Sequence, residues 1–168
     1  MMDEKQKKTA LRMIPYGLYV LTGKAPDGQV AAATINWVSQ ASFNPPLVAL
    51  GVKVDSGAHG VIKASGKFAL NILGKDQGGI AYTFFKPVEA APGLLSGQPY
   101  HDGGNGAPVL DAVPAYLECT LIDTVERGDH SVFIGEVTDA VVRQEPAGRP
   151  DDATLWLKDL GEKVFYGG

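Results

Sequence analysis

Glycine and proline interrupt this chain at short intervals, and they constrain its fold more than any other feature. The 168 residues include 21 glycines and 11 prolines, whereas average glycine usage is about 7%. Proline ends helices because it lacks a backbone N–H donor, and glycine accepts the positive φ angles of tight turns. The chain is therefore expected to form many short elements, mostly strands, rather than a few long helices.

Strand-forming runs alternate with these turn residues. Residues 16–22 and 29–35 flank the turn Ala25-Pro-Asp-Gly28, and this pattern predicts a β-hairpin. The nearly continuous apolar run of residues 47–54 predicts a strand that is buried on both faces. Further extended segments are expected at residues 37–43, 67–73, 115–126, 130–143 and 155–166.

Three short helices are expected between the strands. The first covers residues 3–14 and ends at Pro15, because the residue before a proline avoids helical geometry. Asp55 or Ser56 caps the second, which runs through Ala64. The third covers residues 76–85. Residues 86–114 are rich in proline and glycine, and such a long segment predicts a structureless functional loop or lid.

The connections between these elements indicate the fold class. Hairpins or a single short helix join successive strands, and strands outnumber helices. This arrangement favours a closed or partly closed antiparallel barrel with small helices over a parallel α/β sheet. The length is that of one domain, so residues 1–168 are expected to form a single unit.

Charge, hydropathy and cysteine content exclude several classes of protein. A formal net charge of -4 argues against a nucleic-acid binder, because phosphate contacts need a basic face. A single cysteine, Cys119, excludes an internal disulfide framework and a cysteine-cluster metal site. No apolar run approaches the roughly 20 residues that cross a bilayer, and residues 1–8 lack a signal-peptide pattern. A cytoplasmic protein without membrane or nucleic-acid partners is expected.

The three histidines do not form a recognisable motif. His59, His101 and His130 are far apart in the sequence, so no metal site is expected. Asp129-His130-Ser131 resembles part of a catalytic triad. However, adjacent side chains in a strand point to opposite faces, so His130 and Ser131 are not expected to meet.

Three segments are candidates for ligand binding. Polar residues between Thr34 and Ser42 precede a forced turn, where they either grip a polar planar ligand or cap their own strand edge. The helix start at residues 55–59 either holds a phosphate or is an ordinary cap. Near the glycine-rich loop, Tyr82 and Phe85 either stack on a ring or belong to the core.

Several segments together are similar to one known family. They are YGLYVLTGKAPDGQVAAATINWVSQASFNPPLVALGVKVDSGAHGVI, then KFALNIL and, after a glycine-rich loop, GDHSVFIGEV. In this order they resemble the flavin reductase-like family of FMN-binding split barrels, over roughly residues 11–143. The resemblance implies a mainly β fold, a six-stranded antiparallel split β-barrel with a few short helices. It also implies a homodimer that binds FMN near the subunit interface.

The resemblance further implies which residues form the site. The block from Thr34 to Gln40 would line the isoalloxazine ring and the ribityl phosphate, and the helix start at Ser56 would lie over the phosphate. His130 of the GDH motif would lie close to the flavin and the nicotinamide path, as the catalytic residue. The cofactor-binding residues expected are Thr34, Ile35, Asn36, Trp37, Ser39, Gln40, Ser56, Gly57, His59 and Phe85.

The chain departs from the family pattern at two points. Gly57-Ala58 stands where an arginine or tyrosine followed by threonine is frequent, so one phosphate contact is missing. Asn36 and Trp37 stand where small hydroxyl residues are common. A tryptophan at this position either packs against the ring or fills a dimer interface.

The activity implied is that of an oxidoreductase in which NADH or NADPH reduces FMN by hydride transfer to flavin N5. The expected acceptor is a monooxygenase or another redox protein. The alternative is a flavoredoxin-like protein that retains FMN and passes electrons between protein or metal partners. Two further alternatives are a split-barrel oxidase of a pyridoxal-type substrate and a barrel that has lost flavin.

Overall fold

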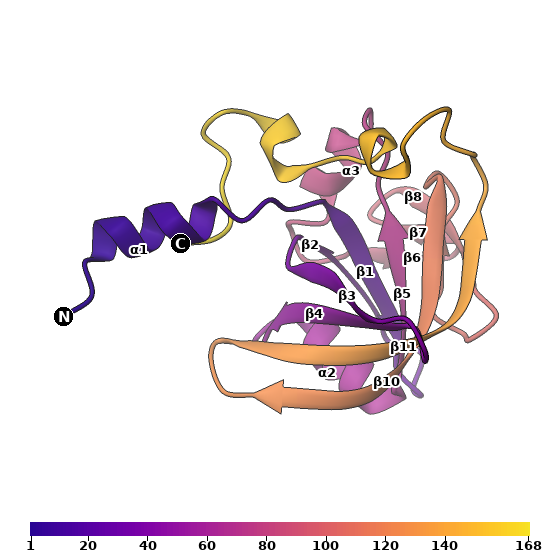
Figure 1. Ribbon diagram of the computed structural model, residues 1–168. Coiled ribbons are helices and arrows are strands. Elements are labelled where there is room, and N and C mark those ends of the chain that lie inside the picture. Colours follow the sequence, from indigo (N-terminus) through magenta and orange to yellow (C-terminus); the bar gives the residue numbers. More distant parts are fainter.

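The computed structural model describes residues 1–168 and is dominated by one coiled antiparallel sheet (Figure 1). Its seven strands lie in the order β2-β1-β5-β10-β11-β4-β3, and neighbours in this order are hydrogen-bonded. Their bounds are β1 Tyr19–Lys24, β2 Val30–Ile35, β3 Val38–Ser42, β4 Leu47–Lys53, β5 Lys67–Ile72, β10 Ala115–Glu126 and β11 His130–Val142.

A smaller antiparallel sheet and five short helices complete the fold. The helices are α1 Glu4–Arg12, α2 Gly57–Ser65, α3 Gly78–Thr83 and two 3₁₀ helices, η1 Pro150–Ala153 and η2 Leu157–Leu160. The strands are β6 Ala90–Ala91, β7 Leu94–Leu95, β8 Gln98–Asp102 and β9 Pro108–Leu110. No helix combines the length and the apolar character needed to cross a membrane.

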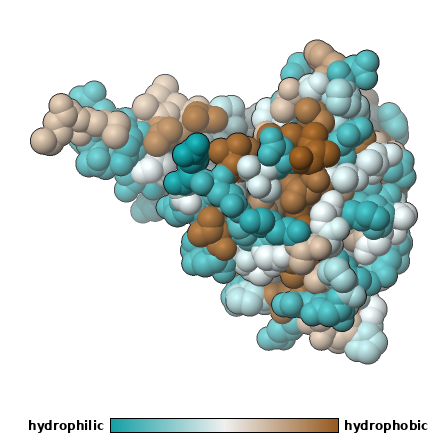
Figure 2. All heavy atoms as spheres, turned by 90° about the horizontal axis from the view of Figure 1, so that it is seen from below, coloured by the Kyte–Doolittle hydropathy of each residue, from teal (hydrophilic) through white to brown (hydrophobic).

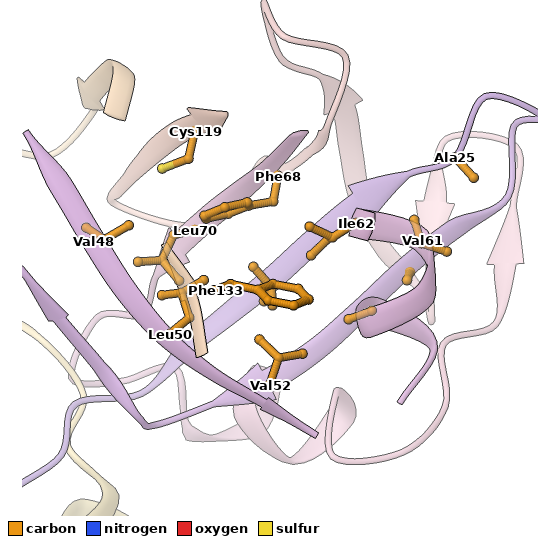
Figure 3. Close-up of a cluster of buried hydrophobic side chains, with 13 residues drawn as sticks. Ala25, Val48, Leu50, Val52, Val61, Ile62, Phe68, Leu70, Cys119 and Phe133 are labelled. Atoms are coloured by element: carbon orange, nitrogen blue, oxygen red, sulfur yellow. The ribbon is translucent and has the colours of Figure 1, made fainter. Parts of the chain in front are cut away.

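The main core shows that the sheet curls around itself. One cluster of 13 buried residues takes side chains from strands near both edges, such as Ala31 of β2 and Leu50 of β4 (Figure 3). Phe68 and Phe133 lie at its centre, and Ile62 of α2 packs against them. Residues from opposite edges can share one cluster only if the sheet bends into a barrel-like shape, with α2 as its cover.

The mainly β, antiparallel prediction is confirmed, but two details of the six-stranded barrel differ. The sheet contains seven strands, and its edge strands β2 and β3 do not pair with each other. The reason lies at Asn36 and Trp37, where the chain leaves β2 and turns so that β3 pairs with β4. The sheet is therefore open along one side.

Local sequence signals predicted several elements correctly. The β1–β2 hairpin has the register Lys24↔Val30, and Gly28 in its turn adopts a φ of 92°. Ser56 caps α2 by accepting a hydrogen bond from the backbone N–H of His59. Gly66, with a φ of 70°, ends this helix in the left-handed conformation that glycine tolerates.

Three predictions about individual segments were wrong. Strand β4 is not buried on both faces; its buried residues alternate with half-exposed ones, because only one face meets the core. Residues 86–114 are not a structureless lid, since they form the second sheet and bury Leu95, Val109 and Leu110. Residues 155–166 form a 3₁₀ helix and an extended tail, and Trp156 makes only an isolated bridge to Gly17.

Helix α1 projects from the body of the molecule, and the end of the chain lies beside it (Figure 1). It has no buried residue. Viewed from below, apolar side chains gather across the middle of the molecule between hydrophilic ones, while α1 extends to one side (Figure 2). The molecule thus exposes an apolar face, and helix α1 beside it makes few contacts with the rest of the chain.

Candidate functional site

A pocket of about 250 Å³ opens where several elements end. The ends of β2 and β4 form its walls, and the start of α2 and the start of β11 border it. The aromatic residues that follow α3 and the tail that follows η2 complete it. We call it the flavin pocket, after the cofactor that the sequence resemblance implies. Its lining is Leu18, Ala33, Thr34, Ile35, Asn36, Gly51, Val52, Lys53, Ser56, Phe84, Phe85, His130, Leu157 and Tyr166.

The fold brings six of the expected site residues together in this pocket, although they come from four separate segments of the chain. Thr34 is held by a hydrogen bond from its hydroxyl to the carbonyl of Ala81, at 2.7 Å. Asn36 is buried, and its side-chain amide donates to the backbone oxygen of Tyr166 at 3.0 Å. The six residues are Thr34, Ile35, Asn36, Ser56, Phe85 and His130.

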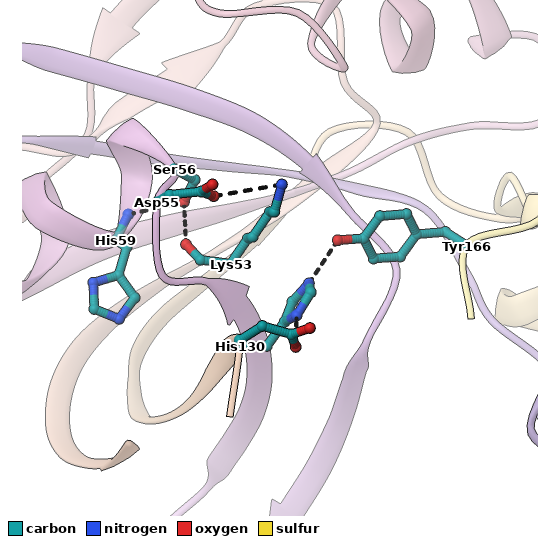
Figure 4. Close-up of polar contacts among 7 residues, drawn as sticks. Lys53, Asp55, Ser56, His59, His130 and Tyr166 are labelled. Carbon is teal, nitrogen blue, oxygen red and sulfur yellow. Dashed lines mark hydrogen bonds and ion pairs between the residues drawn. The ribbon is translucent and has the colours of Figure 1, made fainter. Parts of the chain in front are cut away.

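The other five expected residues lie outside the pocket. Ser39 and Gln40 are exposed on edge strand β3, where their side chains bond to carbonyls of their own strand. The ring of His59 points away from the pocket (Figure 4). Its Nε2 lies 2.8 Å from the hydroxyl of Ser131. Gly57 and Trp37 line no part of the pocket, and the Trp37 ring packs against His130 instead.

His130 is held from three sides. Its Nδ1 lies 2.9 Å from a carboxylate oxygen of Asp129, and its Nε2 lies 2.6 Å from the hydroxyl of Tyr166 (Figure 4). The ring of Trp37 packs against it, with 4.5 Å between the ring centroids. As expected for neighbours on a strand, Ser131 points the other way, toward His59. These contacts fix the orientation of the imidazole.

The charges around His130 define its hydrogen bonds. The pKa of Asp129 is lowered by the hydrogen bond from His130, so the carboxylate is ionised and accepts the Nδ1 proton. Burial raises the pKa of the Tyr166 phenol, so its hydroxyl stays protonated. In the neutral imidazole Nε2 is then an acceptor, and the Tyr166 hydroxyl donates to it.

Two residues of this site gave no signal in the sequence. Tyr166 belongs to the tail, and only the path of the tail across the barrel brings it to His130. Lys53 is the register partner of His130, since β4 pairs with β11, and it provides a cationic group at the pocket. Its ammonium also lies 3.5 Å from a carboxylate oxygen of the exposed Asp55. Strand pairing could have identified Lys53 if the register had been known.

The pocket suits a planar ring with a polar or anionic end. Leu18, Val52 and Phe84 supply apolar walls, whereas Lys53 and Ser56 place an ammonium and a hydroxyl at one side. The Ser56 hydroxyl donates to the carbonyl of Lys53 at 2.7 Å, so the two residues are held together. Apolar walls with a few convergent polar groups are typical of cofactor sites. The donor set therefore fits an isoalloxazine ring with a phosphate-bearing chain.

Comparison with known proteins agrees with this geometry. Residues 11–159 match the family model described as "Flavin reductase like domain". The chain belongs to this family. Membership makes the protein a flavin oxidoreductase, and it accounts for the convergence of the pocket residues from distant segments.

Individual relatives extend over most of the chain. A flavin reductase from Pseudomonas putida is 31% identical over 156 residues, which cover 93% of this chain and 87% of that protein. A second relative, from Rhodococcus opacus, is the reductase component of a 4-nitrophenol 4-monooxygenase/4-nitrocatechol 2-monooxygenase. It is 31% identical, and the match covers 89% of this chain and 76% of that protein.

A solved structure shows the same fold. It is an NADH:FAD oxidoreductase from Streptomyces globisporus C-1027 in complex with NAD and FAD fragments, and it superposes with a TM-score of 0.69. The two sequences are 28% identical, and the match covers 84% of this chain and 86% of the other.

Proposed function

We propose that this flavin reductase binds FMN in the flavin pocket and reduces it with NADH or NADPH by hydride transfer to flavin N5. The observation that carries the proposal is the convergence of Thr34, Asn36, Ser56, Phe85 and His130 on one pocket. An apolar wall faces a cation and a hydroxyl there, as a flavin mononucleotide requires.

Each part of the pocket has a distinct role in this proposal. Lys53 and Ser56 hold the phosphate, and the segment from Thr34 to Asn36 lines the ring edge with backbone and short polar groups. Phe85 packs on the ring. Bound flavin supplies the hydride-accepting chemistry that no amino-acid side chain provides. The protein places the two reacting rings against each other and excludes water.

His130 orients the nicotinamide through its acceptor Nε2 or, when protonated, stabilises negative charge that develops on the reduced ring. Its position supports this role, because the Asp129 carboxylate fixes its Nδ1 as a donor and leaves Nε2 toward Tyr166 and the pocket. An imidazole held in one tautomer can present the same hydrogen bond in every turnover.

The proposed partners are a second copy of the chain and a monooxygenase that consumes reduced flavin. A nine-residue helix with no buried residue, α1, is marginal on its own, so contact with a second copy would stabilise it. Ile122, Val125 and Val132 are exposed apolar residues on the hairpin of β10 and β11. The Rhodococcus relative is the reductase component of a monooxygenase, which supports the second partner.

The proposal is tested by anaerobic absorption spectroscopy with FMN and FAD supplied separately. Protein-bound flavin that bleaches rapidly with NADH or NADPH is the expected result. Slow bleaching with both nicotinamides, together with rapid reduction by a ferredoxin-like donor, would instead favour the electron-transfer alternative. Absence of flavin binding would overturn the proposal.

The role of His130 is tested by His130→Ala in stopped-flow reduction. We expect roughly a 10²-fold slower reduction, the lower range for loss of a positioned catalytic side chain, with FMN content nearly unchanged. His101→Ala is the matched control, because His101 also pairs with a carboxylate, that of Asp111 at 2.6 Å, but lies outside the pocket. Unchanged kinetics in His130→Ala would remove His130 from the site.

A further inference from the structure

Tyr166 separates the flavin pocket from two neighbouring clefts. A cleft of about 310 Å³ lies between the end of α1 and the segment after η2, and we call it the helix cleft. A second, of about 360 Å³, lies beside Trp37 and the last two glycines, and we call it the tail cleft. Tyr166 lines both clefts and the flavin pocket. It is the one residue that lines all three spaces.

The flavin pocket alone is small for the reaction. Its volume of about 250 Å³ lies below the roughly 300–1,000 Å³ of most small-molecule sites. Hydride transfer needs two ring systems in contact, so the second ring must extend into neighbouring space. The adjoining space on the His130 side is the place that the phenol ring of Tyr166 occupies.

The segment that carries Tyr166 is lightly attached. Residues 165–168 make no backbone–backbone hydrogen bond. Gly161, with a φ of 146°, and Gly167, with a φ of 152°, lie on either side of Tyr166. Asn36 and Arg12 donate side-chain hydrogen bonds to the backbone oxygens of Tyr166 and Gly167, and the Tyr166 hydroxyl bonds to His130. The Tyr166 ring also packs against Trp37, and the Arg12 guanidinium lies over the ring of Phe165. Such a segment can move without breaking a strand or a helix.

With residues 165–168 in this position, one buried donor has no hydrogen-bond partner. The indole N–H of Trp37 is buried and has no hydrogen-bond acceptor. Gly167 lies over it, since a Cβ added to that glycine would be 3.9 Å from Nε1. Buried donors are paired in the great majority of cases, and an unpaired one calls for an explanation. An acceptor that replaces the tail, such as a carboxamide oxygen, would satisfy this N–H.

We infer that Tyr166 controls the access of the nicotinamide ring to His130. Its phenol holds the place that the ring takes, and the tail moves aside to release Nε2 of His130 and the indole N–H of Trp37. The inference rests on the proposed function, because it names the residue that the second substrate must displace. Tyr166 therefore controls the affinity for the nicotinamide.

The test measures NAD⁺ binding to the oxidised, FMN-saturated protein by isothermal titration calorimetry. NAD⁺ carries no hydride, so binding is observed without turnover. We expect Tyr166→Ala to bind NAD⁺ about fivefold more tightly than the wild type, because a competitor held by one ordinary hydrogen bond is removed. Tyr166→Phe keeps the ring and loses the hydroxyl, so its affinity should fall between the two.

Tyr100→Ala is the control, since Tyr100 is a partly exposed tyrosine of β8 that lines none of the three spaces. Unchanged or weaker NAD⁺ binding in Tyr166→Ala would overturn the role of Tyr166 and leave the proposed function standing. Failure of the wild type to bind FMN would overturn the proposed function instead. The same NAD⁺ titration on flavin-free protein would then decide the role of Tyr166.

Discussion

Gly51 tests the link between packing and the site, because a side chain there would strike Trp37. The substitution Gly51→Ala places a Cβ 2.9 Å from Cε3 and 3.0 Å from Cβ of Trp37, whereas 3.4–4 Å is ordinary contact. The indole must therefore move by several tenths of an ångström. Because Trp37 Cβ is bonded to the backbone, a rotation of the ring cannot relieve the clash.

The displacement affects both stability and function. The backbone oxygen of Trp37 accepts a hydrogen bond from the Gly51 N–H at 2.8 Å, so the two strands must shift together. Overpacking of this kind costs about 1–3 kcal/mol of the free energy of unfolding. The indole also packs against His130 and, at 5.3 Å between centroids, against Tyr166. We therefore expect weaker FMN binding as well as lower stability.

Urea unfolding and a flavin fluorescence titration measure the two effects. Gly60→Ala is the control, because an added Cβ at Gly60 meets nothing within 4 Å. An alanine inside helix α2 should raise the free energy of unfolding by up to about 1 kcal/mol. If Gly51→Ala unfolds at the wild-type urea concentration and binds FMN normally, the reasoning about Trp37 is refuted.

Two further predictions concern contacts between distant segments. Thr22→Val removes the buried hydroxyl that donates to the Pro108 carbonyl and accepts from Asn71. The free energy of unfolding should therefore fall by about 1–3 kcal/mol. An unchanged urea midpoint would contradict this attachment of the second sheet. Asp159 caps the turn at Trp156 and pairs with Lys75, and the hydrogen bond from Lys75 chiefly lowers its pKa. Asp159 should contribute about 1 kcal/mol to the free energy of unfolding, as other caps do. This contribution should be complete above the usual pKa of an aspartate and should vanish as the pH falls through the lowered pKa of the folded protein. Asp159→Asn should therefore lower stability at pH 7 and flatten the acid side of the pH profile, and a parallel loss at every pH would refute it.

Sequence patterns predicted the elements that depend on local chemistry. The hairpin at Gly28 and helix α2 between Ser56 and Gly66 follow from turn and capping residues that act within a few positions. The strands β10 and β11 follow from long runs of strand-forming residues around Gly128. These elements required no knowledge of tertiary contacts.

The errors occurred where distant contacts decide the structure. Residues 86–114 were expected to be irregular, yet Val109 and Leu110 are buried against the main sheet, and Asn71 accepts a hydrogen bond from the Leu110 N–H. Burial of this kind is a property of the assembled fold. Local propensity favoured a strand for residues 155–166. In the structure this part of the chain forms only two isolated bridges, from Trp156 to Gly17 before β1 and from Thr154 to Gly74 after β5.

The sequence by itself determined the antiparallel β class, the hairpins and helix caps, and it predicted the segments that carry the proposed site. The tertiary structure decided which side chains of those segments share a pocket. His59 faces Ser131 in the interior, whereas Lys53 and Tyr166 meet His130 through strand register and through the path of the tail. Register and chain path are fixed by packing between residues far apart in sequence, and a local pattern holds no information about such packing.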